Sequence, residues 1–268
     1  MKMIVCVKQT PSTNQVQLDP ETHTIIRDGR QSTVNPFDTY ALEEAVRLKE
    51  RLGGQITVMS MGIPAAARLL REAISQGADR GLLLSDRAFA GADTLATSYT
   101  LALGARQIGE FDLILCGKMA IDGDTAQIGP ELAEHLGIPH ISNVQEILEC
   151  SERELLCRKR TDYGTQILRM KLPGLITVDK GINEPRMASI AGVRTSLQAP
   201  LDCLDAAQTG ADPARIGLKG SPTQVVRTFA PERRGQCVRL PNDEDQAAQA
   251  LLALVREKQG GREKGEDA

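Results

Sequence analysis

Aromatic side chains are scarce in this chain. Among its 268 residues there are four Phe, three Tyr and no Trp. Binders of single-stranded nucleic acid need exposed aromatic rings as stacking platforms, and few are available here. The 32 Lys and Arg are balanced by 35 Asp and Glu, so the large basic surface of a general nucleic-acid binder is also missing. We therefore expect no nucleic-acid partner.

Long hydrophobic runs and paired cysteines are missing too. No apolar run approaches the roughly 18 residues of a membrane span. The first residues pass into polar sequence by Lys8, which is not typical of a signal peptide. None of the six cysteines forms a CxxC pair. These absences predict a cytoplasmic protein with reduced thiols and no membrane insertion.

Patterns typical of a metal centre or a catalytic triad are likewise missing. The three His residues show no ligand spacing with Cys or carboxylates. His135 is expected to form a solvated pair with Glu131. Glu43-Glu44 and Arg233-Arg234 are expected to be solvated charge. We therefore predict no metal site and no catalytic side chain.

The first half of the chain alternates apolar runs with amphipathic segments. Helices are predicted to open near Asn35, Pro64 and Asp93. Continuously apolar strands between such helices indicate a parallel sheet covered on both faces. The predicted fold is therefore α/β, with an open, doubly wound, mostly parallel sheet. Its predicted strands are 4–7, 56–59, 82–84 and 111–116.

The pattern changes after Gly137. Four closely spaced runs predict antiparallel strands added to the sheet, and a further hairpin is expected within residues 16–26. Residues 198–242 show no firm periodicity, and so long an irregular stretch suggests that this part packs on another chain. The added strands are expected at 144–148, 154–159, 166–172 and 175–178, a possible strand at 225–229, and helices at 187–197 and 243–258.

The segment from Gly117 to Pro130 carries the most chemical information. It follows the most apolar strand and precedes a helix, and ligands of open α/β sheets bind at the carboxyl ends of strands. A helix N-terminus there offers free N–H groups suited to phosphate. Gly123 permits a tight turn or a close ligand, and Asp124 and Thr125 can cap the helix. From these residues alone, a nucleotide site and a capped strand-to-helix turn both remain open.

A second polar helix start lies at Asn35-Pro36-Phe37-Asp38. One reading is an N-cap followed by Pro in the first turn. The other is that Asn35 and Asp38 also contact a ligand shared with the first segment.

Together these residues resemble the β (small) subunit of electron transfer flavoprotein along almost the whole chain. The resemblance departs at Cys157 and Tyr163 and is poor between Gln198 and Asn242. The segments that carry it are Val5-Cys6-Val7-Lys8-Gln9, Asn35-Pro36-Phe37, residues 42–50, residues 77–81, Gly117 to Gly129, residues 159–177 and Asn183-Glu184-Pro185-Arg186.

The resemblance implies a heterodimer with an α subunit that holds an FAD, and an adenine-nucleotide site in this chain. It implies a nucleotide or flavin domain at 1–185, with a partner-recognition segment and a C-terminal arm on the α subunit at 186–268. Carried over position by position, the cofactor-binding residues are Cys6, Asn35, Pro36, Phe37, Asp38, Met61, Gly117, Lys118, Met119, Ala120, Ile121, Asp122, Gly123, Asp124, Thr125, Ala126, Gln127 and Ile128.

Two branches of the family differ in the nucleotide. In the respiratory branch it is a structural AMP. In the bifurcating branch it is a second FAD, reduced by NADH, whose electrons go separately to an acyl-CoA or hydroxyacid dehydrogenase, through the α-subunit FAD, and to ferredoxin or flavodoxin. The motifs at 35–40 and 122–127 resemble the bifurcating branch, and Ile190 matches the side chain that anchors on the dehydrogenase. The alternatives are the AMP form and a stand-alone ATP-binding module.

Overall fold

A computed structural model of the chain describes residues 1–11, 32–226 and 239–262. The chain divides into two compact units, Met1–Val226 and Arg227–Ala268. The expected hairpin within 16–26, most of the possible strand at 225–229 and the Arg233-Arg234 pair lie outside the described residues. Each unit is treated by itself.

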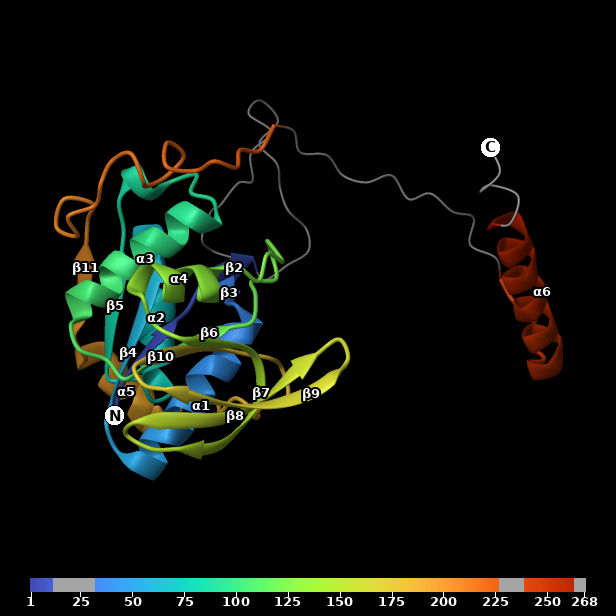
Figure 1. Cartoon of the computed structure of the whole chain (residues 1–268), viewed down its shortest axis with the longest axis horizontal. Helices are drawn as coiled ribbons and strands as arrows, with labels where there is room; N and C mark the ends of the chain where they lie inside the picture. Colours follow the sequence, from blue (N-terminus) through green and yellow to red (C-terminus); the bar gives the residue numbers. More distant parts are fainter. Residues whose placement is uncertain (12–31, 227–238, 263–268) are drawn as a thin grey trace. The chain divides into compact units, whose positions relative to one another are not determined.

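The first unit is built on a nine-stranded sheet (Figure 1). Its strand order is β11-β5-β4-β1-β6-β10-β7-β8-β9, and every pair from β11 to β7 is parallel. The predicted doubly wound parallel sheet is therefore confirmed. The strands are β1 (Lys2–Cys6), β4 (Gln55–Met61), β5 (Arg80–Leu84), β6 (Leu113–Gly117), β7 (His140–Cys150), β8 (Glu154–Thr161), β9 (Gly164–Lys171), β10 (Gly174–Val178) and β11 (Leu201–Leu204).

Helices cover both faces of this sheet. Alternate residues of each strand enter different cores: Met3 and Val5 of β1 join one cluster, and Ile4 and Cys6 join the other. The first cluster is completed by α1 (Pro36–Leu52) and α2 (Ala67–Ser75). The second is completed by α3 (Thr94–Ile108) and α4 (Ile128–Leu136). Two short 3-10 turns, η1 (Pro64–Ala66) and η2 (Arg87–Phe89), precede α2 and α3.

The antiparallel addition is smaller than expected. β7, β8 and β9 pair antiparallel, and the β8–β9 hairpin extends the sheet at one edge (Figure 1). The assignment of residues 175–178 to this addition was wrong, because β10 lies between β6 and β7 and is parallel to both. All five β10 residues are buried, as expected for a central parallel strand with a core on each side.

The chain then returns to the opposite edge of the sheet. Helix α5 (Ile190–Gln198), expected at 187–197, leads into β11, which pairs in parallel with β5. β11 lies in a region where no regular structure was expected. Its exposed Asp202 and Cys203 break the apolar run by which a strand is recognised.

Two further elements complete the described chain. β2 (Gln9–Pro11) and β3 (Ser32–Val34) form a small antiparallel pair before α1. The second unit contains α6 (Glu244–Arg262), which confirms the helix expected at 243–258 and extends it by about one turn. No described helix is both long and apolar enough to cross a membrane.

Candidate functional site

The candidate site lies where the strand order reverses. From β1 the chain builds β4 and β5 on one side, then returns to place β6 on the other side of β1. In open α/β sheets the crevice at the carboxyl ends of such a strand pair is the usual ligand position. β1 ends at Cys6 and β6 ends at Gly117, in parallel register with Cys6 opposite Cys116. The two predicted motifs therefore meet at this edge.

Asn35 joins the two motifs directly. Its side chain makes no capping hydrogen bond to α1, although it occupies the N-cap position. Instead, its Nδ2 donates to the carbonyl of Met119 at 2.9 Å, and its Oδ1 accepts from the N–H of Ile121 at 3.2 Å. Asn35 is 1% exposed. Its amide therefore holds the loop after β6 against the start of α1.

Asp38 makes a second connection, one turn into α1. Its Oδ2 accepts a 2.7 Å hydrogen bond from the backbone N–H of Lys8, and the backbone of Gly117 also bonds it. Burial raises the pKa of Asp38 to about 7, and the hydrogen bonds from Asn35, Lys8 and Gly117 only partly offset this rise. A Cβ at Gly117 would lie 2.3 Å from Asp38 Oδ1, so this contact requires glycine at 117.

Two lysines lie at this edge of the sheet, and each is paired with a carboxylate. Lys8 Nζ lies 2.7 Å from Asp122 Oδ1, and Lys118 Nζ lies 3.3 Å from Asp179 Oδ2. Lys8 and Asp179 were not among the predicted site residues. Asp179 directly follows the buried strand β10, and Lys8 comes two residues after the buried strand β1. A polar residue at the carboxyl end of a parallel strand is the sequence signal that could have identified both.

The loop between β6 and α4 is open to solvent. Residues 121–127 are all exposed, and Gly123 has no atom within 4 Å of the position a Cβ would occupy. Helix α4 begins only at Ile128. The expectation that Asp124 and Thr125 cap this helix was therefore wrong. Asp124 (φ 49°) and Ala126 (φ 55°) have left-handed backbone, which is incompatible with a continuing right-handed helix.

The remaining predicted residues surround this edge. Pro36 and Phe37 start α1, and Met61 ends β4, packed against the second core. Cys6 and Cys116 are buried at the ends of β1 and β6, and the hydrogen bond with Cys6, together with burial, raises the pKa of the Cys116 thiol. No described group of three or more His, Cys, Asp and Glu could hold a metal ion. Ile190 belongs to a separate surface, at the start of α5.

The polar side chains at this edge are of the kinds that bind phosphate and ribose groups. The N–H groups of Ile121, Gly123 and Asp124 are already bonded, to the Asn35 side chain and to the carbonyl of Ala120. Lys8 and Lys118 supply the cationic donors. Asp122 and Asp124 supply acceptors for ribose hydroxyl groups. A separate cleft of about 270 Å³ opens at the amino ends of β1, β4 and β5, and none of the predicted site residues lines it.

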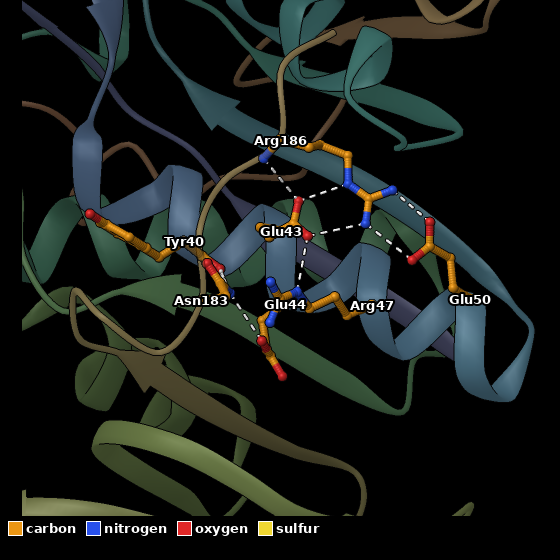
Figure 2. A network of polar contacts seen from close by, with 7 residues as sticks. All are labelled: Tyr40, Glu43, Glu44, Arg47, Glu50, Asn183 and Arg186. Atoms are coloured by element: carbon orange, nitrogen blue, oxygen red, sulfur yellow. Dashed lines mark hydrogen bonds and ion pairs between the residues drawn. The ribbon is translucent and has the colours of Figure 1, made fainter. Parts of the chain in front are cut away.

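Two expectations about solvated charge were wrong. Glu131 does not pair with His135; it accepts hydrogen bonds from the hydroxyl groups of Thr94 and Ser98 on α3. Glu43 and Glu44 are only 4% and 9% exposed, because the segment around Arg186 covers them (Figure 2). A glutamate pair on a helix has the same sequence pattern whether solvent or a distant segment faces it.

Comparisons with known proteins all find similarity to electron transfer flavoproteins and related subunits. The electron transfer flavoprotein domain matches residues 22–209. The chain is 42% identical over 257 residues to the electron transfer flavoprotein subunit beta of Clostridium acetobutylicum, covering 96% of this chain and 98% of that protein. It is also 42% identical to the caffeyl-CoA reductase-Etf complex subunit CarD of Acetobacterium woodii, over 88% and 90% of the two chains, and to protein FixA of Bradyrhizobium diazoefficiens, over 95% and 91%.

Proposed function

The chain belongs to the electron transfer flavoprotein family, and from that premise we propose that it is a β subunit whose crevice binds FAD. The observation that carries the proposal is the loop at 117–128. It places Lys8, Lys118 and the exposed residues 121–127 together at the reversal of strand order. Gly123 adds no side chain to this exposed loop, which supports a dinucleotide in preference to AMP.

A bound flavin would accept a hydride from NADH and release electrons singly, which no thiol of this chain can do. The chain's own residues bind and orient it. Asn35 and Asp38 hold the loop in place, Lys8 and Lys118 would bind phosphate oxygens, and Asp124 would accept a hydrogen bond from a ribose hydroxyl. With so few aromatic side chains, the chain would hold a flavin mainly through backbone and small polar groups.

The proposed partners use other surfaces. The α subunit, which carries the other FAD, binds α6, whose Leu251, Leu252 and Val255 are exposed. An acyl-CoA or hydroxyacid dehydrogenase docks at Ile190, which is 93% exposed. The name of the Acetobacterium woodii relative, a subunit of a caffeyl-CoA reductase-Etf complex, supports an acyl-CoA partner. Ferredoxin or flavodoxin takes the second electron.

Cofactor content tests this proposal. The two subunits are co-expressed, purified and denatured, and the released nucleotides are separated and counted. We expect two FAD per heterodimer. One FAD with one AMP would replace the bifurcating function with structural AMP binding. ATP from a chain that purifies without a larger flavoprotein would favour the stand-alone ATP-binding module.

Truncation tests the role of α6. Ending the chain after Asn242 removes the helix and its exposed apolar residues while leaving the first unit intact. We expect the α subunit to bind at least tenfold more weakly in a titration, because burial of a few apolar side chains contributes several kcal/mol. Unchanged affinity would assign the α subunit to another surface.

A further inference from the structure

Arg186 forms ion pairs with two carboxylates of helix α1, those of Glu43 and Glu50 (Figure 2). Its Nε donates to Glu43 Oε2 at 2.8 Å and its Nη2 to Glu43 Oε1 at 3.1 Å. Its Nη1 and Nη2 donate to the two oxygens of Glu50, at 2.5 and 3.1 Å. The backbone N–H of Arg186 also donates to Glu43, at 3.2 Å. The planar guanidinium thus makes two bonds to each of two side chains seven residues apart on one helix face, a geometry that a lysine ammonium cannot reproduce.

A neighbouring contact extends this attachment. Asn183 Nδ2 donates to the carbonyl of Tyr40 at 3.0 Å and to Glu44 Oε2 at 2.9 Å, and Asn183 is 8% exposed. Residues 183–186 are therefore fixed along α1. The same helix begins at Asn35 and Asp38 in the nucleotide crevice and runs for 17 residues. A helix of that length spans about 25 Å.

The segment that follows Arg186 is apolar and exposed. Met187 and Ile190 are 89% and 93% exposed, and Val193 and Leu197 continue the Ile190 stripe at helical spacing on α5. The far end of α5 is fixed as well: Arg71 of α2 donates to the carbonyls of Ser196 and Ala199. Gly192 packs so closely on the Ser75 carbonyl that an added Cβ would lie 2.1 Å from it.

We propose that Arg186 is a positioning residue, which holds the exposed stripe of α5 in the geometry that a partner dehydrogenase binds. This inference rests on the proposed docking role of Ile190. The reason is entropic: each side chain that must be ordered during association weakens binding, and a segment already fixed at both ends has less freedom to lose. The charge-assisted bonds of Arg186 are the means of fixing the near end.

The matched control is Arg47. It also pairs with Glu43, at 3.0 Å, but it lies on α1 itself, and among the described residues no hydrogen bond or ion pair joins its side chain to residues 183–186. Arg47→Gln therefore removes a cation from the same buried carboxylate without releasing the segment. Glu50→Gln is a second test variant, because Glu50 is exposed and its neutralisation leaves no buried charge unpaired.

Hydrogen exchange in the purified complex of both subunits gives the first result. In Arg186→Gln we expect the amides of residues 187–197 to exchange about threefold to tenfold faster, with a smaller effect in Glu50→Gln. Arg47→Gln should match the wild type in this segment. Wild-type exchange in both test variants would overturn the proposal, whatever the partner.

Electron transfer gives the second result, with an acyl-CoA dehydrogenase reduced by butyryl-CoA as the probe. For Arg186→Gln we expect the KM for the complex to rise several-fold while kcat and the flavin content stay unchanged; Arg186→Lys should recover only part of the loss. If Ile190→Asp raises KM and Arg186→Gln does not, the positioning role fails and the docking role stands. If Ile190→Asp has no effect, the docking role fails too.

Discussion

The carboxylate of Asp38 accepts a 2.7 Å hydrogen bond from the backbone N–H of Lys8, a residue 30 positions earlier in the chain. This bond ties the end of β1 to the first turn of α1. Gly117, at the end of β6, approaches the same carboxylate. One buried side chain thus links the two strands that border the crevice, so its protonation and its contacts should affect both stability and nucleotide binding.

The pKa of Asp38 predicts a specific dependence of stability on pH. Burial raises this pKa from 3.8 to about 7, so the folded protein binds the proton more tightly than the unfolded chain. The stability that this group contributes is fully present below about pH 4 and is lost as pH rises toward 7. Asp38→Asn cannot titrate. Relative to this variant, the wild type should lose up to about 1.4 kcal/mol of unfolding free energy per pH unit across that window.

Urea unfolding of both proteins between pH 4 and 8 measures this difference, and the other carboxylates cancel in the comparison. Parallel curves for wild type and variant would mean that Asp38 keeps an ordinary pKa.

Substitution by Ala should have different effects on stability at Gly117 and at Gly123. In Gly117→Ala the new Cβ would meet Asp38 Oδ1 at 2.3 Å and backbone and side-chain atoms of Phe37 at 2.6–2.7 Å, so the start of α1 must shift. We expect a loss of about 1–3 kcal/mol in stability, with reduced nucleotide retention. Gly123→Ala meets no atom within 4 Å and should leave stability nearly unchanged. Thermal unfolding compares the two, and equal losses would refute the crowding at Gly117.

Asn35 should control the mobility of the loop after β6. Asn35→Ala removes both hydrogen bonds to Met119 and Ile121 and leaves their backbone groups without this partner, at a cost of about 1–3 kcal/mol. We expect faster tryptic cleavage after Lys118. Thr39→Ala serves as the control, since the Thr39 hydroxyl bonds only the carbonyl of Pro36 within the same turn. Similar cleavage rates in both variants would argue against a loop-holding role for Asn35.

A substitution at Asp124 tests nucleotide binding separately from folding. Asn tolerates the left-handed backbone that Asp124 adopts, so Asp124→Asn should fold normally. It removes a carboxylate that we assign to a ribose hydroxyl, and affinity should fall about tenfold or more. Flavin retained after desalting at matched protein concentration is the readout. Full retention would remove Asp124 from the site, whereas loss of the fold would contradict the backbone argument.

Much of the architecture follows from local sequence. The strands β1, β4, β5 and β6 are short apolar runs, and the helices between them begin near Pro or Asp and end near Gly. The segment from Gly117 to Ile128 is also recognisable as a loop between the most apolar strand and a helix, and the structure has this loop between β6 and α4. Such signals are readable because hydrophobic periodicity and capping act over a few residues.

Other features were decided only by tertiary structure. The pattern of β10 did not reveal that it lies between β6 and β7, and Asn35 reads as a cap although it bonds a loop 84 residues away. The sequence predicts solvated charge at Glu43 and Glu44, whereas in the folded chain Arg186 and Asn183 cover them. The chain by itself determined which segments are helices and polar loops and which are strands, except for short or partly polar strands such as β11. Which of them meet was decided by folding, because strand pairing and buried ion pairs depend on surfaces that distant segments bring together.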